Sequence, residues 1–381
     1  MSIVALIETL VGAAIILVVM ADAFETILLP RRVSRRLRLT RIYYQFTWPV
    51  YKRIALRLLT LKARYAMLGI FAPASLLVLF TAWAIALIVG FAIVHISLGT
   101  GLKGMTDAPN FDEYIYFSGV TFLTLGYGDV SPIDTLGRGL AVLEAGLGFG
   151  FLAIVIGYVP VIYSAFSRRE LEISLLDARA GSPPTSAEFL ARMGEHCDEE
   201  ILLDYFEQWE VWSAEVLESH LSFPILAFFR SQHDNQSWLA ALTMMLDTSA
   251  IVLAGIPEFC PYHARLAFAN ARHTAVDLAQ TFLRVPLTDR PDRLDSDRAR
   301  RLIDRLNSAG LALKDEQEFL VKLRELRELY EPFIQTLSEY CHLDLPPFVS
   351  DTPVIDNWRT SAWMRRSRRL EELAGHDDHA D

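Results

Sequence analysis

Charged residues are missing from two long stretches of this 381-residue chain. Residues 65–102 hold no Asp, Glu, Lys or Arg over 38 positions, and residues 145–167 hold none over 23 positions. Because about 20 consecutive apolar residues suffice to cross a bilayer as a helix, both stretches are predicted to span a membrane. Together with a hydrophobic content of 52%, they exclude an ordinary soluble protein.

Cysteines and strand signals are also scarce. The three cysteines, Cys197, Cys260 and Cys341, are odd in number and widely spaced, which disfavours a disulfide framework and favours a reducing compartment. No segment alternates polar and apolar residues as a strand does, and no glycine-rich dinucleotide fingerprint follows a strand. These absences favour an all-α fold without a dinucleotide-binding or β-rich cyclic-nucleotide domain.

Acidic residues are absent from residues 31–64, which hold 11 Lys or Arg. Since the net charge of the whole chain is −10, the remainder carries about −21. The basic residues of this segment alternate with Leu, Ile, Tyr, Phe and Trp, which is typical of a helix lying in the headgroup layer. A voltage-sensing helix is the alternative, but a regular row of arginines within an apolar span is lacking.

A third apolar stretch, Ile3–Leu29, is interrupted by Glu8, Asp22 and Glu25. We interpret residues 1–30 as an N-terminal transmembrane helix. A cleaved signal peptide is the alternative, because residues 21–23 imitate a small-residue cleavage site. No basic residue precedes Arg31, however, and Glu8 stands where a signal peptide needs positive charge. These features favour a helix that is retained.

The basic segment also predicts orientation, because short loops rich in Lys and Arg stay in the cytoplasm. The N-terminus is then outside, residues 31–65 form a basic cytoplasmic interfacial segment, and residues 103–138 lie outside. Everything after Ser167 is cytoplasmic. We therefore expect a multi-pass protein of the cell (inner) membrane.

Between the two strong spans lies Phe111–Leu123, which is too short to cross a bilayer. As a helix it measures about 20 Å, so it enters the membrane from outside and stops half-way. Non-helical backbone at that depth is tolerated only where protein buries it or where it lines a watery path. We expect Thr124–Asp129 to return to the surface in this way.

The residues of this returning segment suit cation coordination by backbone carbonyls. Gly126 and Gly128 can adopt positive φ at little cost, which lets neighbouring carbonyls face one axis, while Tyr127 packs outward. Thr124 adds a hydroxyl at the inner end. Acidic residues around the outer mouth would attract cations: Asp107, Asp112, Glu113, Asp129 and Asp134.

The motif Thr121-x-x-Thr124-Leu125-Gly126-Tyr127-Gly128-Asp129 resembles the signature of potassium channels. The resemblance covers residues 66–167 and implies a two-helix pore module in which Thr124, Leu125, Gly126 and Tyr127 coordinate K⁺. It implies a homotetramer, since one strand cannot surround an ion. The expected partners are K⁺, the lipid bilayer and copies of the same chain, with no nucleic acid, no cofactor beyond the permeant ion, no metal site and no enzymatic activity.

Two positions depart from the usual pattern of that family. Leu125 stands where Val or Ile is usual, which puts conductance and selectivity in question. Val120 stands where some relatives place an acidic residue behind the filter. Thr121 and Glu144 are expected to support the filter, Glu144 by hydrogen bonding to the back of the pore helix.

The inner helix, residues 137–168, contains six glycines. Most of them are expected to serve close helix packing. We predict a hinge at Gly148 and a kink beside an inner gate at Gly157 and Pro160, since proline removes a backbone donor. The apolar side chains expected to line the cavity are Phe149, Leu152 and Ile156.

Residues 168–350 are predicted to form a cytosolic α-helical domain, followed by a flexible tail at 351–381 in which four arginines precede an acidic end. Helical periodicity covers Ile201–Leu217, Ser237–Ala254, His263–Phe282, Asp297–Leu311 and Asp315–Leu337. His273 and Asp277 lie one turn apart and could hold a divalent ion with Glu218 or Asp247. A buried hydrogen-bond network is the alternative for these polar residues.

The sequence thus predicts a K⁺-selective channel gated by an unknown stimulus through its cytosolic helices. The alternative is a membrane-anchored sensor or metal-binding domain whose pore is vestigial or poorly selective.

Overall fold

The computed structural model describes residues 2–27, 29, 39–104, 110–181, 184–196, 199–231, 236–256, 261–282, 292–311, 313 and 315–351. The chain divides into two compact units, Met1–Ser164 and Ala165–Asp381, called here the N-terminal and the C-terminal unit. Several predictions fall outside the described residues: the mouth residue Asp107, the first part of the basic segment, Cys197, Cys260 and nearly all of the tail.

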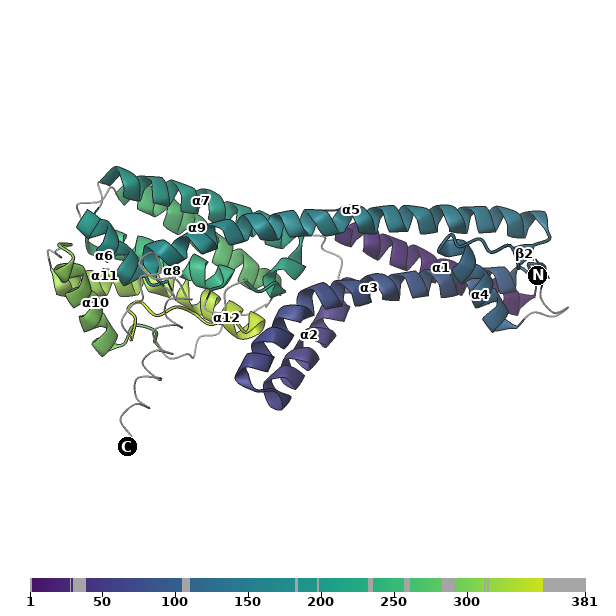
Figure 1. The fold of residues 1–381 in the computed structure, drawn as a ribbon, viewed down its shortest axis with the longest axis horizontal. Helices are drawn as coiled ribbons and strands as arrows, with labels where there is room; N and C mark the ends of the chain where they lie inside the picture. Colours follow the sequence, from purple (N-terminus) through teal and green to yellow (C-terminus); the bar gives the residue numbers. More distant parts are fainter. Residues whose placement is uncertain are drawn as a thin grey trace, which may run out of the picture. The chain divides into compact units, whose positions relative to one another are not determined.

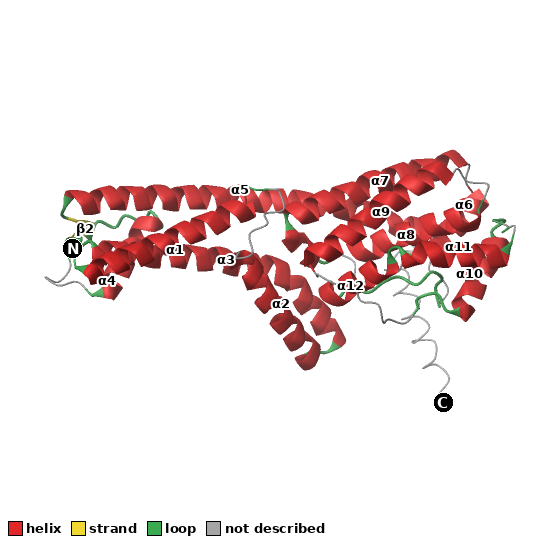
Figure 2. Ribbon diagram, turned by 180° about the vertical axis from the view of Figure 1, so that it is seen from behind, coloured by secondary structure: helices red, strands yellow, loops and turns green. Residues whose placement is uncertain are grey.

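The described residues of the N-terminal unit are almost entirely helical (Figures 1 and 2). Apart from one pair of two-residue strands, all regular secondary structure in the described chain is helical, so the all-α prediction is confirmed. The elements are α1 (Ile3–Ile27), α2 (Leu39–Leu58), α3 (Leu61–Ser97), β1 (Leu102–Lys103), α4 (Phe111–Phe122), β2 (Ser131–Pro132) and the first part of α5 (Thr135–Ala180).

The C-terminal unit is a helical bundle that begins with the last turns of α5. Its other elements are α6 (Ser186–His196), α7 (Glu199–Ser222), the 3-10 helix η1 (Pro224–Phe228), α8 (Trp238–Gly255), α9 (Pro261–Phe282), α10 (Ser296–Ser308), α11 (Glu316–Glu328) and α12 (Glu331–Cys341). The predicted inner helix, residues 137–168, is therefore part of a longer continuous α5 that ends at Ala180.

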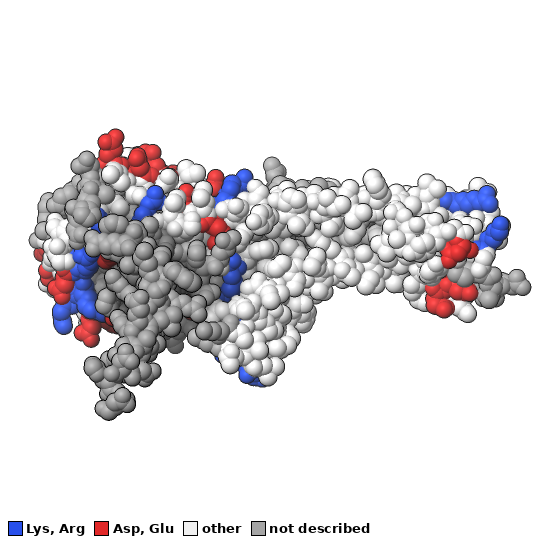
Figure 3. Space-filling view, viewed as in Figure 1, with Lys and Arg blue, Asp and Glu red and all other residues white. Residues whose placement is uncertain are grey.

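Four described helices are long and apolar enough to cross a membrane: α1, α3, α5 and α8. Helix α8 differs from the others because nearly all of its residues are buried within the C-terminal unit. A helix that is apolar all round and covered by protein is a core helix. On the face of the N-terminal unit drawn in Figure 3, the surface over α3 and α5 is uncharged, and charges appear near α4, β2 and the tip of α2.

Helices α1 and α3 cross at two glycines. A Cβ added at Gly12 would lie 2.8 Å from the carbonyl oxygen of Gly90, and one added at Gly90 would lie 2.9 Å from Cγ1 of Ile16. The hydroxyls of Thr9 and Ser97 lie 2.8 Å apart beyond this crossing. Small residues let backbones approach in this way where lipid provides no hydrophobic driving force.

Asp22 of α1 is buried and joins three helices. Its Oδ2 accepts hydrogen bonds from Oγ1 of Thr40 at 2.7 Å and from Nε1 of Trp83 at 3.2 Å. A buried carboxylate requires such partners, so residues 21–23 are part of the fold where the alternative reading places a cleavage site. Retention of this helix stays a prediction.

Helix α2 folds back along the first half of α3. Trp48 is buried against Phe71, with ring centroids 4.8 Å apart, and the Tyr51 hydroxyl donates to the Met67 carbonyl oxygen at 2.8 Å. The described part of the basic segment is thus a helical hairpin, with α3 already beginning at Leu61. The opposite face of α2 exposes apolar side chains in every turn: Ile42, Phe46, Val50, Ile54 and Leu58. Its place in the headgroup layer stays a prediction.

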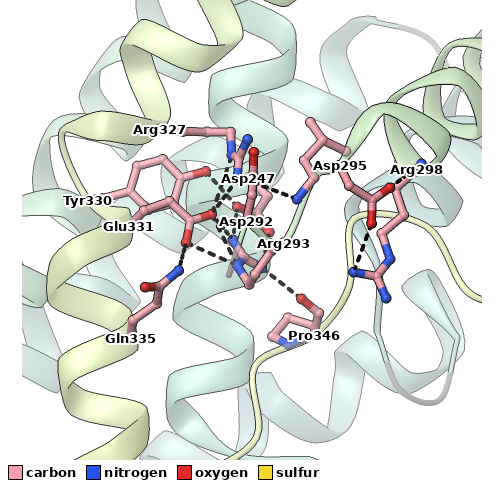
Figure 4. A network of polar contacts seen from close by, with 11 residues as sticks. Asp247, Asp292, Arg293, Asp295, Arg298, Arg327, Tyr330, Glu331, Gln335 and Pro346 are labelled. Atoms are coloured by element: carbon pink, nitrogen blue, oxygen red, sulfur yellow. Dashed lines mark hydrogen bonds and ion pairs between the residues drawn. The ribbon is translucent and has the colours of Figure 1, made fainter. Parts of the chain in front are cut away.

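A buried ionic network fastens the core of the C-terminal unit (Figure 4). Arg293 lies between two carboxylates, with Nη2 2.8 Å from Asp247 and 2.9 Å from Glu331. The Tyr330 hydroxyl donates to Oδ1 of Asp247 at 2.6 Å. Burial, and then the Asp247 charge, raise the pKa of Tyr330 well above its ordinary value of 10.0, so the hydroxyl remains a donor.

The predicted helix Asp315–Leu337 is wrong, because the chain breaks into α11 and α12 near Leu329. Pro332 lies in the first turn of α12, where its missing N–H costs nothing, whereas inside one long helix it would remove a hydrogen bond and clash with the preceding turn. The break also brings Tyr330 into the ionic network. The proline was visible in the sequence as a signal against a continuous helix.

The described part of the chain contains no cluster of side chains that supports the alternative of a metal site. His273 is 62% exposed, with its Nε2 3.8 Å from Asp277, while Asp247 belongs to the buried network. Within the described ranges, no group of three or more His, Cys, Asp or Glu side chains is placed to hold an ion. The hydrogen-bond-network interpretation therefore fits Asp247.

Arg169, near the end of α5, is buried in the C-terminal unit. Its guanidinium donates to the carbonyl oxygens of Leu226 at 2.8 Å and Phe229 at 2.9 Å, and Nη1 lies 3.3 Å from Nε2 of His220. His220 Nδ1 lies 2.8 Å from the Val216 carbonyl oxygen, so the neutral ring donates from Nδ1 and accepts at Nε2. Burial, and then the Arg169 charge, lower the pKa of His220 well below its ordinary value of 6.5.

The glycine crossing predicts that Gly12→Ala destabilises the protein. The new Cβ would lie 2.7 Å from Cγ2 of Val94, and overpacking of this kind costs about 1–3 kcal/mol. Gly69→Ala in α3 is the matched control, since no atom of this chain lies within 4 Å of its added Cβ. Thermal unfolding in detergent should show a lower midpoint for Gly12→Ala alone; equal midpoints would contradict the packing role.

The buried neutral His220 predicts a loss of stability in acid. The unfolded imidazole takes up a proton near pH 6.5 while the folded one resists it, so the stabilisation is complete above this pH and is lost as the pH falls. In the parent protein the free energy of unfolding should fall by up to about 1.4 kcal/mol for each pH unit below this value. His220→Gln should remove this dependence on pH. Unfolding of the full-length protein and variant on both sides of pH 6.5 measures it, and identical slopes would argue against the assignment.

Candidate ion-conduction site

Helix α4 is a half-length helix with defined ends. It has 12 residues, about 18 Å, which is too short to cross a bilayer. The Asn110 N–H donates to the Glu113 carboxylate at 2.8 Å, and Asp112 and Glu113 in the first turn suit the positive end of the helix dipole. The helix ends at Phe122, so its partial negative end lies next to Thr124.

The sign of φ alternates along the segment that follows. Thr124, Gly126 and Gly128 have φ of +55°, +61° and +78°, and Leu125 and Tyr127 between them do not have positive φ. In an ordinary strand successive carbonyls point to opposite sides, and left-handed residues at every second position reverse that alternation. Glycine adopts this conformation freely, whereas Thr124 carries strain.

The outer end of this segment is tied to the turn after α3. Strands β1 and β2 pair antiparallel, with Leu102 opposite Pro132. The Asp134 carboxylate accepts from the Gly101 N–H at 3.1 Å and from the Gly137 N–H at 2.7 Å, which joins the turn to the start of α5. Gly104 has no room for a side chain because the Asp129 carbonyl oxygen fills that space.

Glu144 lies fully buried behind α4. Its carboxylate is hydrogen-bonded to the Ser118 hydroxyl of α4, and its other oxygen lies 3.4 Å from Nε2 of His95 in α3. Ser118 Oγ also lies 2.8 Å from the Ile88 carbonyl oxygen. Helices α3, α4 and α5 therefore meet at one polar cluster, made by Ser118, His95 and Glu144.

Gly148, one turn further along α5, packs against the last turn of α4. A Cβ added there would overlap the carbonyl group of Phe122. Glu144 and Gly148 are four residues apart, as are Ser118 and Phe122, so two successive turns of α5 contact two successive turns of α4. The close packing thus explains why residue 148 is a glycine, and its role as a hinge stays a prediction. Gly157 and Pro160 lie within the continuous α5.

The predicted filter and cavity residues are exposed on the single chain. Tyr127 and Phe149 are each 68% exposed, and Ile156 is 63% exposed. Leu125 and Leu152 are also exposed, whereas Thr121 is half-buried. Of the predicted mouth residues, Asp129 accepts from the Tyr116 hydroxyl at 2.6 Å, and Asp112 and Asp134 are exposed.

Sequence reasoning missed His95, Ser118 and Thr100 as parts of this site. His95 Nδ1 lies 3.1 Å from Oγ1 of Thr100, whose carbonyl oxygen accepts from the Tyr114 hydroxyl at 2.8 Å. The signal was present for His95 alone, because it is the one titratable side chain besides tyrosine in residues 65–102. A Ser and a Thr among apolar residues carry no comparable signal.

The comparison with protein families places this site in an ion-channel module. Residues 73–164 match a family model described as an ion channel. The match covers most of α3, all of α4, the 124–129 segment and the first part of α5. The match over this part of the chain supports a role in ion conduction.

Curated relatives are membrane or short bacterial proteins. The chain is 24% identical over 225 residues to the uncharacterized membrane protein YdjJ of Bacillus subtilis, covering 58% of this chain and 63% of the relative. It is 35% identical over 84 residues to Protein LctB of Bacillus caldotenax, covering 19% of this chain and 62% of the relative. The chain thus spans less than two thirds of the length of each. No solved structure matches it.

The contact between Gly148 and Phe122 predicts a local effect of Gly148→Ala. The added methyl would push on the Phe122 backbone and loosen the last turn of α4, a strain of about 1–3 kcal/mol. Gly150→Ala is the matched control, because no atom of this chain lies within 4 Å of its added Cβ. Amide hydrogen exchange should quicken at 119–122 in the first variant only. Exchange as slow as in the parent protein would rule out the close contact.

Proposed function

We propose that the protein is a K⁺-selective channel that conducts passively through a homotetrameric pore. The residues proposed to hold K⁺ are those of the 124–129 segment: Thr124, Leu125, Gly126, Tyr127, Gly128 and Asp129. Thr121 and Glu144 support them from behind. The ion-channel match of residues 73–164 supports conduction, and the geometry of the segment supports the selectivity.

The observation that carries the proposal is the alternation of φ at Thr124, Gly126 and Gly128. Carbonyl oxygens that face one axis can replace the water shell of a cation, as backbone carbonyls do in K⁺ filters. The segment directly follows the negative end of α4, which favours a cation there. No cofactor is needed for this chemistry, because the ligands are main-chain oxygens and the Thr124 hydroxyl.

Four copies of the chain complete the site. A single segment offers oxygens from one side only, and a closed ring requires a rotation axis through the ion. The exposed apolar side chains support this arrangement: in a tetramer Phe149, Leu152 and Ile156 would lie around the axis, and Tyr127 would pack outward against a neighbouring copy. We assign the first three to the cavity below the filter.

Leu125 sets the degree of selectivity in this proposal. Its side chain is 50% exposed on the single chain, so in the proposed tetramer a neighbouring copy would cover it. Val120 on α4 supplies no carboxylate behind the filter, and Glu144 on α5 brings one to Ser118 of the same helix. The carboxylate support of α4 thus comes from the inner helix.

Helix α5 provides the path for gating. It runs unbroken from Thr135 to Ala180, and Arg169 fixes its last turns to η1 through the carbonyls of Leu226 and Phe229. A rearrangement of the C-terminal unit would therefore act on the helix that lines the pore. Gly148, Gly157 and Pro160 are the proposed places of bending.

We further propose the orientation that the positive-inside rule gives. The N-terminus and the acidic mouth with Asp112, Asp129 and Asp134 are outside, and the C-terminal unit is cytoplasmic. In a bacterium the location is the inner membrane. In this division, residues 1–30 are the first span, 31–65 the interfacial segment, 66–167 the pore module, 168–350 the regulatory domain and 351–381 the tail.

The proposal predicts that Gly126→Ala abolishes K⁺ flux while assembly persists. Holding an alanine at positive φ costs about 1–2 kcal/mol in each copy, so the carbonyl ring would distort in all four. Gly139→Ala, in open space at the start of α5, is the matched control and should conduct normally. The release of K⁺ and of Na⁺ from loaded liposomes is measured for each of the two variants.

Two results would contradict the proposed function. Undiminished K⁺ flux in Gly126→Ala would remove the 124–129 segment from the conduction path. A purified particle without fourfold symmetry in electron microscopy would leave each segment without the partners that its carbonyls need.

A further inference from the structure

We infer that His95 is a positioning residue of the ion pathway: by binding Glu144 and Thr100 it fixes α4, and with it the filter, against the two spanning helices. This inference rests on the proposed function, because it concerns the geometry of the same 124–129 segment. His95 lies on α3 and does not line the pore, so it acts through Glu144 and Ser118 and touches no ion.

His95 and Glu144 face each other in the interior of the N-terminal unit. Both side chains are 0% exposed, and Nε2 lies 3.4 Å from Oε2. Neither of these two atoms makes a hydrogen bond within the described part of the chain, so the 3.4 Å approach is the polar contact that each of them has. Buried polar atoms without a partner are costly, so each of the two groups holds the other in place.

The second imidazole nitrogen connects this pair to the outer turn. Nδ1 lies 3.1 Å from the Thr100 hydroxyl, and the Thr100 carbonyl oxygen accepts from Tyr114 of α4 at 2.8 Å. In the tautomer that carries its proton on Nε2, on the side of Glu144, Nδ1 accepts a hydrogen bond from the Thr100 hydroxyl. One ring therefore links α5 on one side to the turn beside the filter mouth on the other.

Helix α4 is held at this level by three contacts with α3 and α5. Ser118 binds Glu144 and approaches the Ile88 carbonyl oxygen, and Phe117 meets the His95 ring edge to face with centroids 5.0 Å apart. Thr124 begins the filter six residues after Ser118, and the contact of Gly148 with Phe122 lies between them. A shift of Ser118 would therefore be passed along one and a half helical turns to the first coordinating oxygen.

A packing role alone would also explain a buried ring, and two substitutions separate the roles. His95→Phe keeps an aromatic ring but loses both nitrogens. His95→Gln loses the ring but keeps an amide that can donate to Glu144. If the polar contacts position α4, Gln should preserve function better than Phe; if the ring only fills space, the order should be the reverse.

The experiment compares the K⁺/Na⁺ permeability ratio of full-length channels in liposomes, at equal amounts of assembled particle. We expect His95→Phe to lower the ratio about tenfold, as the loss of a buried hydrogen-bonded partner does, and His95→Gln to stay closer to the parent protein. Ser97→Ala is the matched control: it removes a polar contact of the same helix, but one made to Thr9 of α1. Its ratio should not change.

A milder variant decides the matter if His95→Phe fails to assemble. Thr100→Val keeps the shape of the side chain and removes only the hydroxyl that faces Nδ1, so a lowered ratio supports the inference and an unchanged ratio overturns it. An unchanged ratio in assembled His95→Phe overturns it as well. If the parent protein itself does not distinguish K⁺ from Na⁺, the proposed function fails first, and the inference falls with it.

Discussion

Main-chain polar groups in a hydrocarbon layer must find partners within protein or water, and this constraint governs the N-terminal unit. Helix α4 satisfies its own groups for 12 residues and then gives way to non-helical backbone, which lipid alone cannot surround. The chain fastens the outer end of that backbone through β1, β2 and Asp134. What faces the 124–129 segment from the other side must come from water, ions or further copies of the chain.

The spanning helices surround α4 with contacts that lipid cannot replace. Helix α5 offers a carboxylate at Glu144 and a bare backbone at Gly148, and α3 offers His95. Behind α3, the glycine crossing and the Asp22 cluster hold α1 in place. Close backbone approach and buried polar contacts are the two ways in which helices associate where burial of apolar surface brings no gain.

Helix α5 belongs to both units by its covalent continuity. Its first turns contact α4, and its last turns are fixed by the guanidinium of Arg169 to η1. The centre of the C-terminal unit combines the buried α8 with a buried carboxylate, Asp247, which is bound by Arg293 and Tyr330. A buried ion pair of this kind adds little net stability but is costly to break, so it favours one arrangement of the bundle.

The sequence by itself determined the helical class, the apolar spans, the half-length of α4 and the positions where positive φ is affordable. These properties are local: charge-free length, helical period and glycine placement decide them without reference to distant residues. The same local reasoning failed at Pro332, where it overlooked a signal that was present. Leu125, whose side chain is half exposed on the single chain, is a position that local reasoning cannot assess.

Only the tertiary structure decided which distant polar residues meet. These contacts depend on how each helix is rotated and how deep it lies against the next. They include the approach of His95 to Glu144, the hydrogen bond between Asp22 and Trp83, and the packing of Gly148 against the backbone of Phe122. Periodicity identifies the face of a helix that avoids charge, but a membrane helix is apolar all round. The apolar pattern of such a helix therefore contains little information about which residues it contacts, and these contacts are decided by packing alone.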